Sequence, residues 1–275
     1  MTPLMSLLAD LASINLGLLL LALLALLVLA KEIGFAIGSR ARRAGAAQDA
    51  AGQADRQKEG VGLVTGGMLA LVAFILALAM SMAQGRHDAR RDVVRDEANA
   101  IGTVWLRADF AGPAAGPIRA LMRDYAAARL EAVITPPGPG DVGAELARTN
   151  AMQGRIWALA STAARENHTP EAALLIASLN DMFDLSLTSR RAFTDRVPIG
   201  ILRMLLWSAL ITMGVVGYNF GLAGARHLVF SGLLLVFWSG SMVLIVDLNN
   251  PTKGWIKVDP APMVWTIEGF GPARP

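Results

Sequence analysis

The stretch from Gly60 to Asp109 constrains the fold more than any other part of the chain. It begins as a charge-free apolar run that ends at Gly85, and it continues without proline into a charged segment. An apolar run of this length is typical of a helix that crosses a bilayer. The first strong helix breaker is Gly112-Pro113. We therefore predict one long helix over Gly60–Asp109 that spans the membrane and projects from it.

Four apolar blocks account for the hydrophobic character of the chain. Hydrophobic residues make up 54% of the sequence and charged residues only 17%, whereas about a quarter of the residues in soluble proteins are charged. The blocks are Leu11–Ala30, Gly60–Gly85, Met204–Ala225 and Leu228–Val246. The first is too long for a signal peptide, and no Lys or Arg precedes it. We predict that all four are retained as transmembrane spans.

These spans predict an all-α membrane protein with four transmembrane helices, in which the second span continues as a long helix. A helical soluble domain is inserted between the second and third spans. The predicted parts are residues 1–85, with two spans and a basic connector; 86–200, the soluble domain; 201–246, the last two spans; and 247–275, an irregular tail. Within the connector, residues 31–59, the run AGAAQDAAGQADRQ has few bulky apolar residues and forms either a helical extension or a mobile loop. Proline and glycine exclude a long helix from the tail.

Helix start and stop signals divide residues 86–200. Gly116-Pro117 opens one helix, and the TPPGPG run at 135–140 ends it. Asp141 is a candidate N-cap for a helix through Glu166, and Thr169-Pro170-Glu171 provides a cap, an N1 proline and a first-turn acid for the next helix. The segment holds 14 Lys and Arg against 14 Asp and Glu. Because a nucleic-acid binder needs a net basic face, we exclude nucleic acid as a partner.

Residue types that carry catalysis or bind metal are scarce. Cysteine is absent, and the three histidines lie far apart in the sequence. This excludes disulfides, thiolate metal sites and cysteine nucleophiles. The sequence contains no zinc-ligand spacing, nucleophile elbow or phosphate loop. We therefore expect no metal, no cofactor and no enzymatic activity.

The second span carries the first candidate functional residues. Phe74, Leu78 and Met82 recur every four residues and share one helix face. Such a face can form a hydrophobic pore constriction, which gates by dewetting. The alternative is packing against lipid or against another helix.

Four arginines follow this span. They are Arg86, Arg90, Arg91 and Arg95. In a symmetric oligomer they would surround a central axis and concentrate anions there. Asp88, Asp92, Asp96 and Glu97 interleave with them, so ion pairing along a solvated helix is the alternative.

Polar residues near the predicted membrane boundaries form a third set. Asn180 and Asp184 share a helix face, Arg226 lies in the turn between the third and fourth spans, and Asp247 ends the fourth span. We expect these groups to pair into a network that joins the soluble domain to the spans. An ion-contacting site is the alternative.

Two glycines in the third span form a fourth feature. Gly217 and Gly221 are four residues apart, so they lie on one face and let another helix approach closely. A generic packing face of small residues is the alternative.

Several of these motifs resemble those of the bacterial bestrophin-like family. The matching residues are Glu32, Gly34, Gly38 and Arg40–Arg43; Ser81–Ala83, Arg86, Arg90, Arg91, Glu97–Thr103 and Leu106–Asp109; Leu179, Asn180, Met182 and Asp184; Gly217, Tyr218, Gly221, Gly224 and Arg226; and Asp247, Leu248, Pro251, Gly254, Pro262 and Met263. Leu78 and Met80 stand where the family usually carries aromatic residues. Asn249 and Asn250 stand where it usually carries Asp and Arg.

The resemblance implies a homo-oligomeric channel of the bacterial inner membrane that conducts small anions. The second helix would line the pore, Leu78 and Met82 would narrow it, and the segment from Arg86 to Arg95 would form the vestibule. The residues that would hold the extended helices in register are Glu97, Asn99, Arg107 and Asp109. The alternative is a non-conducting membrane scaffold or accessory subunit that binds a partner through its helical domain.

Basic residues around the first span bear on the orientation of the chain in the membrane. None precedes this span, and six follow it in the connector. The positive-inside rule then places the connector in the cytoplasm and residues 86–200 on the periplasmic side. The four arginines just after the second span favour the opposite orientation.

Overall fold

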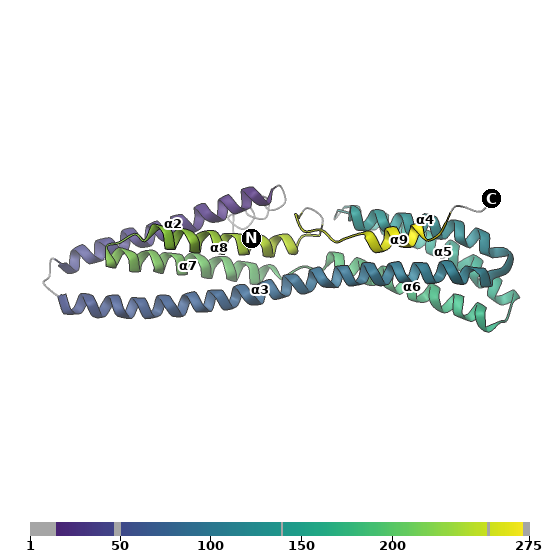
Figure 1. Ribbon diagram of the computed structural model, residues 1–275, viewed down its shortest axis with the longest axis horizontal. Coiled ribbons are helices and arrows are strands. Elements are labelled where there is room, and N and C mark those ends of the chain that lie inside the picture. Colours follow the sequence, from purple (N-terminus) through teal and green to yellow (C-terminus); the bar gives the residue numbers. More distant parts are fainter. Residues whose placement is uncertain (1–14, 47–50, 139, 252–253, 272–275) are drawn as a thin grey trace. The chain divides into compact units, whose positions relative to one another are not determined.

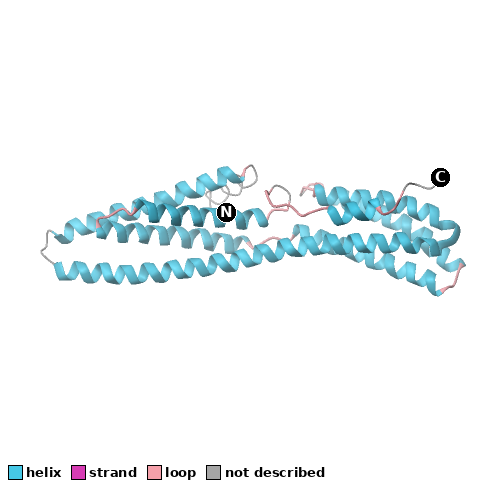
Figure 2. Cartoon of the chain, viewed as in Figure 1, coloured by secondary structure: helices cyan, strands magenta, loops and turns pink. Residues whose placement is uncertain are grey.

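The computed structural model describes residues 15–46, 51–138, 140–251 and 254–271. Within these residues all regular structure is helical (Figure 2). The helices, all but η1 labelled in Figure 1, are α2 (Leu16–Ala46), α3 (Ala51–Arg107), η1 (Ala108–Ala114), α4 (Ala115–Ile134), α5 (Val142–Glu166), α6 (Pro170–Thr194), α7 (Ile199–Ala223), α8 (Leu228–Leu248) and α9 (Ala261–Glu268).

The long helix predicted from the sequence is α3. It is continuous over 57 residues and includes both the apolar span and the charged segment. It ends at Arg107, where the 3₁₀ helix η1 follows. Gly112 within η1 has a φ of 57°, a backbone conformation that favours glycine. The helical path therefore stops at the Gly112-Pro113 breaker, as the sequence predicts.

The chain divides into two compact units. Unit 1 consists of Met1–Gly85 and Arg196–Trp255, and unit 2 consists of Arg86–Asp195 and Ile256–Pro275. The described residues include four helical stretches that are long and apolar enough to cross a membrane. The apolar helices α2, α7 and α8, with the first part of α3, belong to unit 1. These lengths and compositions support a multi-pass membrane protein.

Unit 1 is built around a close contact between α2 and α7. A β-carbon on Gly34 or Gly38 of α2 would collide with the backbone of α7, and one on Gly217 or Gly221 of α7 would collide with the backbone of α2. Gly217 and Gly221 therefore lie at a close contact between two helices, which their spacing allows. Leu27, Ala79, Ala209 and Ile245, one from each apolar helix, are fully buried in the core of this unit.

Unit 2 is a bundle of the remaining part of α3 with α4, α5, α6 and α9. The buried residues of α4 follow its predicted apolar stripe, with Ile118, Met122 and Tyr125 fully buried. At the start of α6 the Thr169 side chain accepts a hydrogen bond from Ala172 N at 3.1 Å, which confirms the predicted cap. Asp141 occupies the N-cap position of α5, although its side chain makes no capping hydrogen bond.

Two segments differ from their simplest sequence interpretation. The first apolar block continues as helix α2 to Ala46, and α3 begins at Ala51, so a helical extension describes most of the connector. Residues 11–14 and 47–50 lie outside the described residues. The tail is predicted to be irregular, but it contains α9, with proline in its first turn. Proline presets the backbone for a helix start, and Met263 of α9 is fully buried in unit 2.

Candidate functional site

The candidate pore face lies on the part of α3 that belongs to unit 1. Phe74 is 61% exposed, Leu78 is 50% exposed and Met82 is 36% exposed. Val72, Ile75 and Ala79, which border this face around the helix, are buried in the core of the unit. The three predicted residues therefore share one apolar face that the chain itself does not cover. Such a face is available to a pore axis, to lipid or to another subunit.

Arg86 and Arg90 hold the start of the charged segment against the end of α6. Arg86 Nη1 forms an ion pair with Asp195 Oδ2 at 3.0 Å. Arg90 is only 1% exposed, and its guanidinium donates to the carbonyl oxygens of Ala192 and Asp195 at 3.0 and 3.1 Å. Carbonyl groups at a helix C-terminus attract cations. Both arginines, predicted as pore-lining residues, thus bind the end of α6, and Arg90 lies away from the exposed face.

The next two arginines remain at the surface of α3. Arg91 pairs with Asp88 at 4.0 Å, and Arg95 pairs with Asp92 at 3.2 Å, in both cases at i,i+3 spacing. Arg95 also contacts Asp96 at 3.3 Å. These are the pairs expected along a solvated helix. The five side chains are each at least half exposed.

A buried ion network lies in the core of unit 2. Glu97 of α3 is fully buried and accepts two hydrogen bonds from Arg129 of α4, at 2.5 and 3.3 Å. Arg129 also contacts Glu145 of α5 at 3.1 Å, and Glu145 in turn pairs with Arg190 of α6. The network therefore links four helices of the bundle. Because both partners are buried, removing Arg129 would leave the Glu97 carboxylate without its cation, whereas removing Glu97 would leave Arg129 with Glu145 alone.

Tyr125 lies next to this network. Its hydroxyl accepts a hydrogen bond from Gln153 Nε2 at 3.3 Å, and the same amide donates to Ser186. Burial and the nearby Glu97 carboxylate raise the pKa of the Tyr125 phenol to about 12. Both effects favour the neutral phenol, because they penalise the negative charge of the ionised form.

A second group of charged residues lies in unit 1 at the turn between α7 and α8. Lys31 is buried and contacts Glu32 at 3.2 Å and Ser231 Oγ at 3.3 Å. Glu32 also pairs with Arg226 at 3.1 Å, and the Arg226 guanidinium lies 4.6 Å from the centre of the Phe35 ring. These contacts join α2 to the turn and to the first turn of α8.

The far end of α8 carries different polar contacts. Asp247 is buried, and its Oδ1 accepts a hydrogen bond from Trp255 N at 2.7 Å. Asn249 Oδ1 accepts from Val197 N at 2.7 Å, while the Asn249 carbonyl accepts from Arg196 at 2.8 Å. These bonds tie the entrance of α7 to the exit of α8. Arg226 and Asp247, predicted to share a network, lie at opposite ends of α8.

The remaining predicted polar residues each have a separate position. Arg107 donates to the Leu174 carbonyl at 3.0 Å, and Asp109 pairs with Arg119 at 2.8 Å. Asn99, Asn180 and Asp184 are exposed. Of the eight polar residues predicted either to pair into a network or to hold the extended helices in register, Glu97 is the one that enters the buried ion network. Its partners Arg129, Glu145 and Arg190 were not among the predicted site residues.

The described residues contain no group of three or more His, Asp or Glu side chains placed to hold a metal ion. The two main features of the candidate site are the exposed apolar face of α3 and charges that pair within the chain. Such an arrangement can support an ion path or a binding surface. Together, the four apolar helices and the helical second unit, as far as the structure describes them, support a multi-pass helical membrane protein.

The family model of the Bestrophin-like domain matches residues 33–263. This covers most of the chain, and the protein therefore belongs to the bestrophin-like family, as the motifs indicate. A search of curated proteins gave no match, and neither did a search of solved structures.

Proposed function

We propose that the protein is a homo-oligomeric, bestrophin-like channel of the bacterial inner membrane, with α3 lining the pore. The observation that carries this proposal is the apolar face of Phe74, Leu78 and Met82, which is exposed in a single subunit. In a ring of subunits this face surrounds the axis and forms a hydrophobic constriction. Arg86 borders the vestibule in this arrangement. Arg90 is omitted from the lining because its side chain is buried.

Small anions are the proposed permeant ions. This part of the proposal rests on the family resemblance, and it is tested by the reversal potential across a membrane with unequal salt on its two sides. A shift toward the Nernst potential of chloride supports anion selectivity. A shift toward the potential of the cation overturns it.

The pore lining is tested by placing a polar residue on the proposed constriction. Leu78→Ser hydrates an apolar constriction and is expected to raise conductance of the reconstituted protein several-fold, because dewetting no longer closes the pore. Leu233→Ser is the matched control. Leu233 is 66% exposed on α8, and the proposal assigns it to lipid, so its substitution is expected to leave conductance unchanged. Equal effects of the two substitutions would contradict the assignment of α3 to the pore.

A non-conducting scaffold is the second candidate. It is favoured by two exposed leucines in unit 2, Leu106 at 71% and Leu174 at 48%. The side chain of Arg107, the residue after Leu106, donates a hydrogen bond to the Leu174 carbonyl. Exposed apolar groups of this kind are typical of protein-binding surfaces. This alternative predicts that purified protein in liposomes conducts no more than empty liposomes do.

A further inference from the structure

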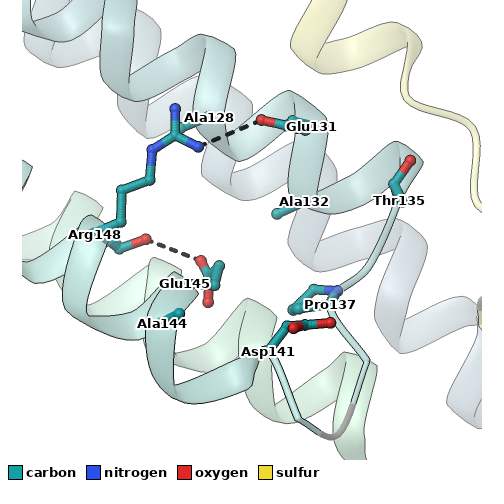
Figure 3. Close-up of a pocket in the computed structure, with 10 residues that line it drawn as sticks. Ala128, Glu131, Ala132, Thr135, Pro137, Asp141, Ala144, Glu145 and Arg148 are labelled. Carbon is teal, nitrogen blue, oxygen red and sulfur yellow. Dashed lines mark hydrogen bonds and ion pairs between the residues drawn. The ribbon is translucent and has the colours of Figure 1, made fainter.

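A groove runs between α4 and α5 on the surface of unit 2. It consists of two adjoining cavities of about 300 and 340 Å³ that share Ala128, Glu131 and Arg148. Alanines form much of its lining: Ala127, Ala128, Ala132 and Ala144. Figure 3 shows one of these cavities, with Glu131 and Arg148 pointing toward one another from α4 and α5. A lining of small side chains lets another helix approach the backbone closely.

Charged residues of opposite sign face one another across part of this groove. Asp124 and Glu131 lie on the α4 rim, and Arg148 and Arg155 lie on the α5 rim. Each pair is seven residues apart, which is two helical turns or about 10 Å. The acids Asp141 and Glu145 also line the groove on the α5 side, and Glu145 is paired internally with Arg129 and Arg190. Glu131 and Arg148 pair across the groove at 3.6 Å, but both side chains are about two-thirds exposed. An ion pair with this exposure contributes little to stability, so each residue can exchange it for a pair with a docked surface.

One exposed, charged surface of α3, here called the α3 ridge, has the charge pattern that such a groove requires. Its acids Asp88, Asp92 and Asp96 recur every four residues, and Arg91 and Arg95 form a parallel basic row. At 100° per residue, the two rows point in directions roughly 80° apart. A helix that lies between two others contacts them in two such directions. The acidic row extends over about 12 Å, which is close to the spacing of the charges on each rim.

We propose that the α3 ridge of one subunit docks into the α4–α5 groove of a second copy of this chain. The acidic row then faces Arg148 and Arg155, and Arg91 and Arg95 face Asp124 and Glu131. Both surfaces belong to unit 2, and they are different patches of it. A contact between different patches is head-to-tail, and it forms a ring when the rotation closes. The inference rests on the homo-oligomer of the proposed function and names the contact that builds it.

Cysteine cross-linking tests this contact, because the chain has no cysteine of its own. Asp92→Cys and Arg148→Cys are introduced into one chain, which is reconstituted in liposomes and oxidised. A head-to-tail contact is expected to give a ladder of covalent multimers up to the full ring. When the two single-cysteine variants are co-expressed instead, the expected products stop at dimers, because each chain then has one of the two thiols.

A second pair of cysteines controls for cross-links that form by random collision of chains. Arg165→Cys replaces Arg148→Cys in the presence of Asp92→Cys. Arg165 is an exposed arginine on the same helix, α5, that does not line the groove. This pair is expected to give no ladder, and a ladder of equal strength from it would overturn the proposal.

The oligomeric state of the same samples, measured by light scattering, separates the two proposals. An oligomer without a cross-link between Asp92→Cys and Arg148→Cys overturns the α3–groove contact and leaves the channel proposal standing. A monomer overturns both. Arg148→Glu with Arg155→Glu provides a second measurement, because reversing the basic rim is expected to shift the oligomer toward smaller species. An oligomer unchanged by this double reversal contradicts the contact.

Discussion

Gly217 of α7 lies directly against the carbonyl oxygen of Lys31 of α2, and no space for a side chain remains between them. The same relationship recurs along the contact, where Gly221 faces the Phe35 carbonyl and Gly38 faces the Tyr218 carbonyl. In a bilayer the association of helices depends on close packing, because lipid is as apolar as the side chains. The glycine contact therefore provides much of the specificity that places α2 beside α7.

Gly217→Leu is expected to separate the two helices and to destabilise the folded protein. Overpacking a tight contact typically costs about 1–3 kcal/mol, and backbone against backbone is at the upper end of that range or above it. We expect a fall in the melting temperature in detergent of several degrees or more, together with loss of folded protein during purification. Gly240→Leu is the control, since a β-carbon at Gly240 of α8 would meet nothing within 4 Å. Equal losses of stability in both variants would contradict the role given to the glycine contact between α2 and α7.

Glu97→Gln is expected to destabilise unit 2 more than Glu145→Gln does. Glu97 is fully buried, whereas the Glu145 side chain is 21% exposed. Breaking a buried pair costs about 3–5 kcal/mol, and the contact between Arg129 and Glu145 offsets part of this loss. Thermal unfolding of the two variants in the same detergent provides the measurement. A larger loss for Glu145→Gln would show that the exposed part of the network holds the bundle.

The Tyr125 phenol is expected to titrate at a pH near 12 and not near 10. In the Tyr218→Phe variant Tyr125 is the single tyrosine of the chain, so tyrosinate absorbance follows it alone. Between these pH values the unfolded state has released the proton that the folded state keeps. The free energy of unfolding therefore falls as the pH rises through this range, and Tyr125→Phe removes that contribution. Titration of the folded protein at a pH near 10 would contradict the burial argument.

The orientation of the chain is expected to place unit 2 on the periplasmic side. Arg226 pairs with Glu32, so the α7–α8 turn lies at the same end of unit 1 as the basic cluster Arg40–Arg43 of α2. This adds to the positive charge expected in the cytoplasm. In spheroplasts a membrane-impermeant maleimide is expected to label Glu171→Cys, and to label Gly45→Cys only after permeabilisation. The reverse labelling pattern would invert the topology.

Much of the helical architecture follows from local sequence signals. The long α3 is predicted by the absence of breakers between Gly60 and Asp109, and the start of α6 by Thr169-Pro170. Such signals act over a few residues, so one sequence is sufficient to read them. The tail is less predictable, because α9 depends on the burial of Met263 in unit 2 as well as on the prolines at its start.

The candidate site residues could be predicted from the sequence only where they share one face of a single helix. Phe74, Leu78 and Met82 share a face by periodicity alone, and all three are exposed. The partners of Glu97 come from other helices, so spacing along α3 gives no sign of them. A signal exists for Arg129, which lies on the apolar stripe of α4 between Tyr125 and Val133 at intervals of four residues. A charge on a buried stripe indicates a buried partner. The same signal exists for Arg90, which lies on the buried stripe of α3 seven residues after Ala83 and four before Val94.

The glycine contact between α2 and α7 also sets an order of events during synthesis. The ribosome completes α2 at Ala46, but α7 begins only at Ile199. At about 5–20 residues per second, the first helix waits on the order of ten seconds or more for its neighbour. Throughout this delay Lys31 lacks Ser231, its partner on α8. The glycine face of α2 is open to lipid or to the insertion machinery during the same time. The contact between α2 and α7 can therefore form only after most of the chain has been synthesised.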